Sequence, residues 1–170
     1  MTAKVTIFQG KSFTLLADSV HGELVQAEDE VLVVALTGQD EVLLTSEPSA
    51  AFAETVLILP GGQVEAGETH DLTAKRELRE ETGFKANQLD FLGEVRPFSK
   101  YLTVRSFVYL ARRLEFSPLA GDEKYEISLQ RVPLQDFENL IADRQLSDAC
   151  AIAGLYMARH FLADHSRKEA

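Results

Sequence analysis

One stretch of the sequence, residues 57–84, limits the possible folds more than any other. It begins with a short apolar run at residues 57–59, which is typical of a buried strand, and the Pro-Gly-Gly sequence at 60–62 ends that strand in a turn. Thr69 is a suitable N-cap for the helix that follows, and Gly83 is a suitable stop for it. The stretch therefore predicts a buried strand, a glycine turn, a short loop and a helix.

The predicted helix carries three carboxylates on one face. Glu77, Glu80 and Glu81 stand at i, i+3 and i+4, so their side chains share one side of the helix. Like charges at that spacing cost an isolated helix about 0.2–0.5 kcal/mol per pair, and Arg76, four residues before Glu80, offsets only part of this cost. Such a face is either a solvated surface or a set of hard oxygen ligands for a divalent cation, which phosphate groups would complete.

The same residues resemble the signature of the Nudix hydrolases. That signature reads glycine, five residues, glutamate, seven residues, Arg-Glu, a bulky apolar residue, any residue, Glu-Glu, any residue, glycine and a bulky apolar residue. Every fixed position is met, by Gly62, Glu68, Arg76, Glu77, Leu78, Glu80, Glu81, Gly83 and Phe84. At a background frequency of about 6% per fixed residue, a chance match is on the order of one in a million. The resemblance covers the central part of the chain.

The rest of the chain reads as an α+β pattern. Strands are expected at residues 30–37, 42–45, 89–95, 104–111 and 127–132, and helices at residues 134–141 and 148–162. This pattern agrees with the α/β/α sandwich around a mixed sheet that the Nudix resemblance implies.

Three further strands are expected near the N-terminus, at residues 4–8, 12–20 and 23–27. They divide the chain into an N-terminal strand arm, residues 1–28, and a Nudix domain, residues 29–170. Because the arm contains little apolar surface, we expect the main domain or a second subunit to cover it, and we interpret the arm as a dimerisation element.

Charge and cysteine content narrow the partners and the compartment. The chain has 27 acidic and 17 basic residues and a net charge of −10. The lack of a basic excess disfavours a nucleic-acid partner. Cys150 is the only cysteine, which excludes a disulfide within the chain and predicts a small buried side chain. No apolar run reaches membrane-spanning length and no signal-peptide core is found, so we expect a cytoplasmic protein with no membrane partner.

The resemblance implies a divalent cation, Mg²⁺ or alternatively Mn²⁺, and assigns its ligands. Glu77 and Glu81, with the carbonyl oxygen of Gly61, are expected to bind the cation directly. Glu80 is a further ligand or lies just outside the coordination sphere. Glu68 is expected to reach the cluster from the loop, directly or through water.

Two other roles at the site follow from the resemblance. Arg76 is expected to orient carboxylates through the planar fork of its guanidinium. The general base is a loop glutamate in the ADP-ribose branch of the family, which makes Glu123 or Glu126 the candidate, and Glu80 is the alternative. The segment around Glu123 is equally well read as an ordinary exposed turn.

The substrate assignment rests on resemblance to the branch that cleaves ADP-ribose and other ADP compounds. The N-terminal arm, Glu54, and the acidic segment before the last strand are similar to that branch, whose members are homodimers with an arm that reaches the partner. Glu54 is then expected near the ribose or base, and Phe98 and Tyr101 are candidates for stacking on a base. Ser99 departs from the pattern, because that branch usually has a proline at this position.

The expected function is metal-dependent hydrolysis of ADP-ribose or a related nucleoside diphosphate sugar, giving a nucleoside monophosphate and a sugar phosphate. The expected partner is a small nucleotide, bound by a homodimer. Two alternatives stay open. One is a Nudix enzyme that acts on nucleoside triphosphates or dinucleoside polyphosphates, and the other is a non-catalytic Nudix domain that senses a nucleotide.

Overall fold

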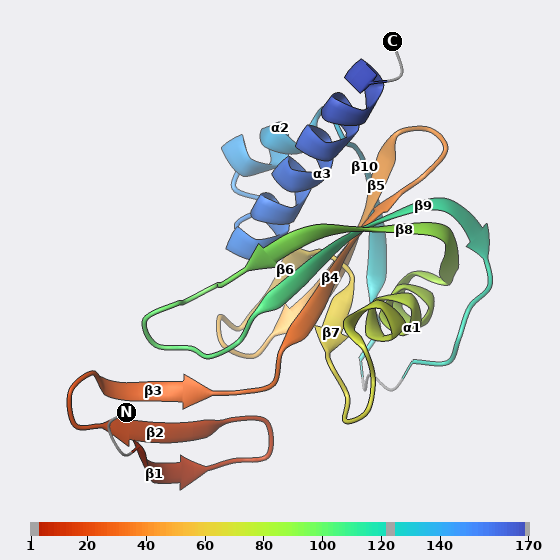
Figure 1. Ribbon diagram of the computed structural model, residues 1–170. Coiled ribbons are helices and arrows are strands. Elements are labelled where there is room, and N and C mark those ends of the chain that lie inside the picture. The colour runs from red at the N-terminus through yellow and green to blue at the C-terminus, as the bar shows by residue number, and fades with distance from the viewer. Residues whose placement is uncertain (1–3, 122–124, 169–170) are drawn as a thin grey trace.

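The computed structural model describes residues 4–121 and 125–168 of the chain. In these residues a mixed seven-stranded sheet carries helices on both faces, and a separate three-stranded sheet lies at the N-terminus (Figure 1). The α+β class and the helix–sheet–helix layering predicted from the sequence are confirmed.

The elements have the following bounds. The strands are β1 (Lys4–Gln9), β2 (Thr14–Asp18), β3 (Gly22–Gln26), β4 (Glu30–Leu36), β5 (Glu41–Ser49), β6 (Glu54–Ile58), β7 (Gly61–Gln63), β8 (Phe84–Val95), β9 (Ser106–Phe116) and β10 (Ser128–Pro133). The helices are α1 (His70–Thr82), α2 (Phe137–Ala142) and α3 (Ala149–Lys168).

The large sheet splits at one end, and the split positions the glycine turn. Its strand order is β10-β5-β4-β9-β8, with β4 and β9 parallel. The antiparallel pair β4–β5 is joined only at Ala35↔Leu43 and Leu36↔Val42. Beyond these pairs β5 pairs with β6 and β4 pairs with β7. The chain that links β6 to β7 therefore crosses the split, directly beside α1.

Two apolar clusters, one on each face of the sheet, fix the helices. Val33, Leu43 and Leu78 belong to the cluster under α1, whereas Leu44 and Leu155 belong to the cluster under α2 and α3. The assignment alternates along each strand, because successive strand side chains point to opposite faces. Each fully buried Leu or Val contributes about 1.5–3 kcal/mol relative to an exposed one, so α1 is held firmly over the split. Cys150 is buried at the start of α3, as the sequence predicts.

Several element boundaries differ from those expected. β2 covers five residues of the expected 12–20, because the N–H of Gly10 donates to the carbonyl of Phe13 and residues 11–13 belong to the turn. β8 begins at Phe84, directly after α1, because it pairs with β9 as far as Phe116. The helix expected at 134–141 is the shorter α2, and α3 runs beyond residue 162.

The N-terminal sheet rests on the β8–β9 loop, residues 96–105. The N–H of Val25 donates to the carbonyl of Tyr101 at 2.6 Å, and the N–H of Thr103 donates to the carbonyl of Val25 at 3.0 Å. Strand β1, at the far edge, is exposed along its whole length, including Val5 and Ile7. The arm is thus covered by its own chain along one edge only, and Figure 1 shows it below the main sheet.

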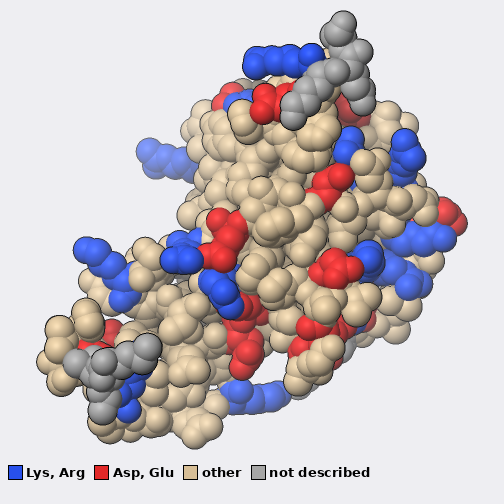
Figure 2. All heavy atoms as spheres, in the orientation of Figure 1, with Lys and Arg blue, Asp and Glu red and all other residues tan. Residues whose placement is uncertain are grey.

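The surface charges are unevenly distributed. Figure 2 shows basic side chains mainly toward the edges of this face, at the left, right and top, and most of the acidic side chains nearer its centre. Among the residues described, no helix is both long enough and apolar enough to span a membrane.

Candidate active site

Helix α1 has the boundaries that the sequence predicts. Thr69 occupies the N-cap position, and Gly83 ends the helix in the left-handed conformation, at φ 76°. A glycine is favoured there because a side chain strains this conformation. The Thr69 hydroxyl does not cap the backbone and donates instead to the carboxylate of Asp71 at 2.6 Å.

The predicted glycine turn at residues 60–62 packs directly against α1, but its two glycines lie in strand β7, because they pair with Val31 and Leu32 of β4. The N–H of Gly61 donates to Oε2 of Glu81 at 3.0 Å. A Cβ atom on Gly62 would lie 2.3 Å from Oε1 of Glu77, and a Cβ atom on Gly61 would lie 2.1 Å from the carbonyl oxygen of Val31. At Gly61 the obstacle is backbone, so this position requires glycine, whereas at Gly62 a side chain would displace the Glu77 carboxylate. The carboxylates of Glu77 and Glu81 thus lie against two neighbouring glycines.

Burial distinguishes the two interpretations of the acidic face. Glu77 is only 6% exposed, so it does not belong to a solvated surface. Glu80 and Glu81 are partly buried beside it. An ionised carboxylate that is buried requires a cationic or hydrogen-bonding partner. The acidic face is therefore a structured polar site rather than a solvated surface.

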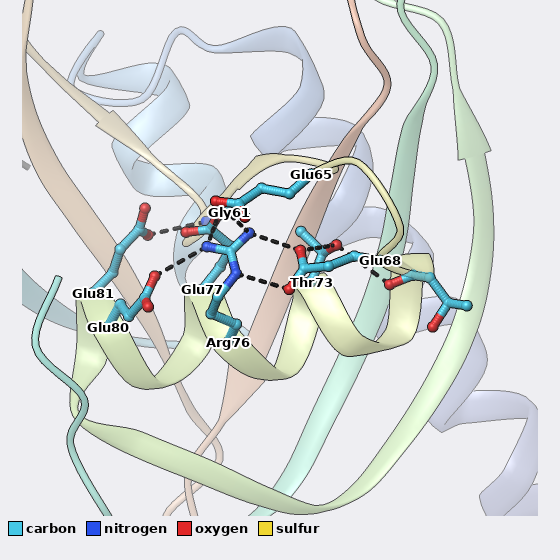
Figure 3. Close-up of polar contacts among 9 residues, drawn as sticks. Gly61, Glu65, Glu68, Thr73, Arg76, Glu77, Glu80 and Glu81 are labelled. Atoms are coloured by element: carbon cyan, nitrogen blue, oxygen red, sulfur yellow. Dashed lines mark hydrogen bonds and ion pairs between the residues drawn. The ribbon is translucent and has the colours of Figure 1, made fainter. Parts of the chain in front are cut away.

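The guanidinium of Arg76 lies between the carboxylates (Figure 3). Its Nε and Nη2 donate to the two oxygens of Glu68 at 3.1 and 3.0 Å. Its Nη1 donates to Glu77 at 2.8 Å and to Glu80 at 3.0 Å. The hydrogen bonds with Glu68 raise the pKa of Arg76 above its ordinary value, and those with Arg76 lower the pKa of Glu68. The planar fork predicted for Arg76 is present, with Glu68 as its bidentate partner.

Glu68 reaches the cluster from the loop, and it does so through Arg76. The hydroxyl of Thr73 also donates to Oε2 of Glu68, at 2.8 Å, which fixes the carboxylate over the first turn of α1. Within residues 4–121 and 125–168, no group of three or more His, Cys, Asp or Glu side chains is arranged to hold a metal ion. The cation that Glu68, Glu77 and Glu80 share in this structure is the guanidinium.

The residues nevertheless fit a hard divalent cation. Oxygen ligands are what Mg²⁺ prefers, and the turn brings two carboxylates and a strand-end peptide together. The steric contact between Gly62 and Glu77 shows that the turn is shaped to let a carboxylate approach the backbone. Glu77, Glu81 and the Gly61 carbonyl are therefore the residues available for such an ion.

The two loop candidates for a general base lie before β10. Glu126 is exposed, and Glu123 lies outside the described residues. The hydroxyl of Tyr125 donates to Oε2 of Glu47 on β5 at 3.1 Å, which connects this segment to the sheet. Among the described residues, the other Glu47 oxygen, Oε1, is buried and has no hydrogen-bond partner. Glu47 was not predicted, because its partner is 78 residues away in the sequence.

The substrate candidates lie on other elements. Glu54 is the exposed first residue of β6, opposite Ser49. Phe98 and Tyr101 are exposed on the β8–β9 loop, with their ring centroids 6.0 Å apart. Tyr101 lines a hollow next to the N-terminal sheet, and no α1 carboxylate is among the residues that line this hollow. The structure thus brings together the candidates on α1 and its loop but places Phe98 and Tyr101 apart from them.

A further cluster beside the glycine loop was not predicted. The His70 ring stacks on Phe107, with centroids 3.6 Å apart and an interplanar angle of 25°. The guanidinium of Arg105 lies 5.5 Å from the centre of the same ring and forms an ion pair with Asp29 at 2.6 Å. Asp29, His70 and Arg105 border a hollow of about 940 Å³ that residues 63–66 also line. The residues of this cluster come from separate segments of the chain, so no local sequence pattern indicates them.

Comparison with known proteins gives a consistent result. A family model described as NUDIX domain matches residues 26–153. The chain is 30% identical over 159 residues to the ADP-ribose pyrophosphatase of Bacillus subtilis (strain 168), covering 86% of this chain and 85% of that protein. It is 28% identical over 139 residues to the ADP compounds hydrolase NudE of Escherichia coli (strain K12), covering 82% and 74% of the two chains.

A solved structure is similar as well. The crystal structure of an ADP compounds hydrolase superposes with a TM-score of 0.82 at 26% sequence identity, covering 97% of this chain and 94% of that chain. The similarity extends over the N-terminal sheet, the central domain and the C-terminal helix together.

Proposed function

Because this chain belongs to the Nudix hydrolase family, we propose that it hydrolyses the diphosphate of ADP-ribose or a related nucleoside diphosphate sugar. The products are a nucleoside monophosphate and a sugar phosphate. The observation that carries this proposal is the convergence of Glu77 and Glu81 on the Gly61–Gly62 turn, one carboxylate buried and the other bonded to the turn. The names of the similar proteins, ADP-ribose pyrophosphatase and ADP compounds hydrolase, support the substrate class.

Nudix hydrolases use divalent metal ions, and we infer that Mg²⁺, with Mn²⁺ as a substitute, binds here. Glu77, Glu81 and the carbonyl of Gly61 would hold it, with Glu80 and Glu68 as outer or additional ligands. The ion, when bound, neutralises diphosphate charge and makes a water molecule more acidic. The chain itself supplies the fixed positions of these oxygens.

Arg76 is the proposed positioning residue. Its hydrogen bonds hold three carboxylates at once, so the acidic side chains keep one arrangement despite their mutual repulsion. A guanidinium suits this task because it stays charged and its donors lie in one plane.

The proposed general base is Glu126 or Glu123, with Glu80 as the alternative. Glu126 is exposed to solvent and lies next to Tyr125, which is bonded to the sheet. Glu80 accepts a hydrogen bond from Arg76 at 3.0 Å, so one of its oxygens is already occupied. A carboxylate in this role accepts a proton from the attacking water.

Substrate recognition is assigned to groups outside α1. Glu54 is proposed to accept hydrogen bonds from a ribose or base, and Phe98 and Tyr101 to offer an aromatic surface. The lone, buried Cys150 and the nucleotide substrate together fit the proposed cytoplasmic location.

The first test is product release from a panel of nucleotides, with Mg²⁺ and then with excess chelator. The panel contains ADP-ribose, other nucleoside diphosphate sugars, dinucleoside polyphosphates and nucleoside triphosphates. We expect metal-dependent release of AMP from ADP-ribose at the highest kcat/KM. Faster cleavage of another compound would identify that compound, instead of ADP-ribose, as the substrate. Tight binding without turnover of any compound would identify a nucleotide sensor.

We also propose a homodimer formed through the N-terminal sheet. Strand β1 has a free edge and exposes Val5, Ile7 and Phe8. An exposed apolar edge strand is a surface that another chain pairs with or covers. Sedimentation velocity over a range of concentrations is expected to give twice the chain mass of 18.9 kDa. A single species of 18.9 kDa at every concentration would contradict the dimer.

A further inference from the structure

The segment that connects β9 to β10 begins against helix α1. The guanidinium of Arg79 donates through Nε to the carbonyl of Ser117 at 2.9 Å. The N–H of Ser117 donates in turn to the carbonyl of Gly83, at 2.8 Å. Because Arg79 directly precedes Glu80 and Glu81, these bonds fix the start of the segment to the turn of α1 that carries two carboxylates of the site.

The other end of the segment contacts β5 through Tyr125. Strand β10 begins at Ser128, which is paired with Ser46, so Glu47 is the first β5 residue beyond the pairs of these two strands. The Tyr125 hydroxyl donates to Oε2 of Glu47 at 3.1 Å. This bond therefore extends the contact with β5 past the end of β10, to the residue that directly precedes Glu126.

Glu47 itself lies on the face of the sheet that α1 covers. Side chains alternate along β5, and Leu43, four residues earlier, belongs to the apolar cluster under α1. Glu47 also pairs with Val56 of β6, the strand that leads to the two glycines. Among the described residues its Oε1 is buried and has no hydrogen-bond partner. Because a desolvated carboxylate without donors is costly, the hydroxyl at its other oxygen is an important contact.

We propose that Tyr125 and Glu47 are a positioning pair for the hydrolytic reaction, whose hydrogen bond fixes the segment that carries Glu126 against the sheet. The inference rests on the proposed function, in which Glu126 is a candidate general base. A base accepts a proton only within hydrogen-bond reach of the attacking water, and a misplacement of about 1 Å costs on the order of a hundredfold in rate. The pair acts through Glu126 and needs no contact with the substrate.

The first experiment is the steady-state kinetics of Tyr125→Phe, which lacks only the hydroxyl, with ADP-ribose and Mg²⁺. We expect kcat to fall about tenfold and KM to stay within about twofold, because the position of a base affects the chemical step rather than binding. The matched control is Tyr156→Phe, whose lost hydroxyl donates to Glu138 at 2.7 Å. The two tyrosines are similarly exposed, at 46% and 41%, but the control bond joins α3 to α2, so its loss should leave both constants unchanged.

Variants of Glu47 test whether the same bond is responsible. Glu47→Gln keeps an oxygen that accepts the hydroxyl and is expected to retain kcat within about threefold, whereas Glu47→Ala should match Tyr125→Phe. Tyr125→Phe combined with Glu47→Ala should lose no more than either variant alone, because both remove one bond. Full kcat in Tyr125→Phe, or losses that multiply in the double variant, would overturn the proposal. Thermal melts establish that each variant is folded.

Hydrogen exchange separates this inference from the proposed function. The backbone amides of residues 125–127 are expected to exchange faster in Tyr125→Phe and Glu47→Ala than in the wild type, but not in Tyr156→Phe. This measurement needs no turnover. A wild type that cleaves no compound of the nucleotide panel would refute the proposed function, whereas unchanged exchange in Tyr125→Phe would refute the pair as the contact that holds the segment.

Discussion

The region around α1 and the region around the N-terminal sheet are built on opposite principles. At α1 the acidic side chains are buried or half-buried, and hydrogen bonds from Arg76, Thr73 and the glycine turn fix them. At the N-terminal sheet the side chains of β1, and Tyr101 on the loop beside it, are exposed, and Lys4 and Lys100 lack ion pairs among the described residues. Chemistry requires fixed groups, whereas recognition of a ligand or a second subunit requires accessible ones. Mutations should therefore act very differently in the two regions.

The largest effect is expected from Glu81→Gln. The amide oxygen can still accept the N–H of Gly61, so the fold is retained, but the negative charge is lost. We expect kcat to fall about a hundredfold to a thousandfold. Steady-state kinetics measure kcat, and a thermal melt measures whether the fold is retained. Glu23→Gln, at an exposed position on β3, is the control. Equal activity of the variant and the wild type would remove Glu81 from the site.

Gly62→Ala tests the steric contact between the turn and the helix. Its Cβ would lie 2.3 Å from Oε1 of Glu77, so the carboxylate or the turn must move. We expect about 1–3 kcal/mol lower unfolding free energy and on the order of tenfold lower activity. Gly38→Ala is the matched control, because nothing lies within 4 Å of its added Cβ. Similar losses in both variants would mean that the contact has no special role.

Arg76→Lys tests the shared guanidinium. The variant keeps the charge but loses the bidentate contact with Glu68, at an expected cost of about 1–3 kcal/mol. Because Arg76 lowers the pKa of Glu68 in the folded state, this stabilisation is present above the unfolded-state pKa of Glu68. It is lost as the pH falls through the lower, folded-state value. Urea unfolding at pH 7 and in acid should show the difference between wild type and variant shrinking in acid.

The smallest effect on catalysis is expected from Ile7→Lys on the exposed strand β1. Because this side chain is 53% exposed, the substitution should change the unfolding free energy by about 0.5 kcal/mol or less. We expect kcat to be retained and the dimer to dissociate, as measured by sedimentation. A loss of kcat as large as that of Gly62→Ala would show that the two regions are not separable.

Much of the α1 region was predictable because its determinants are local. The helix limits follow from Thr69 and Gly83, and the shared carboxylate face follows from helical spacing. The ion pair between Arg76 and Glu80 follows from their spacing of four residues. These features need only neighbours in the sequence.

The remaining features depend on residues that the fold brings together. The burial of Glu77, rather than of Glu80, results from the strand that carries Gly62. The stacking of His70 on Phe107 and the bond between Tyr125 and Glu47 join elements far apart in the sequence. The hollow at Lys4 and Lys100 forms between the first strand and a loop near residue 100, which no periodic pattern relates.

Asp29 connects the two regions through direct contacts. Its carboxylate forms an ion pair with Arg105, in the loop that supports the N-terminal sheet, and its carbonyl accepts the N–H of Val64, in the loop that leads to α1. The next residue, Glu30, is paired with Gln63 on β7, beside the glycine against which the Glu77 carboxylate lies. One residue between the arm and the central sheet therefore fixes where both loops begin relative to each other.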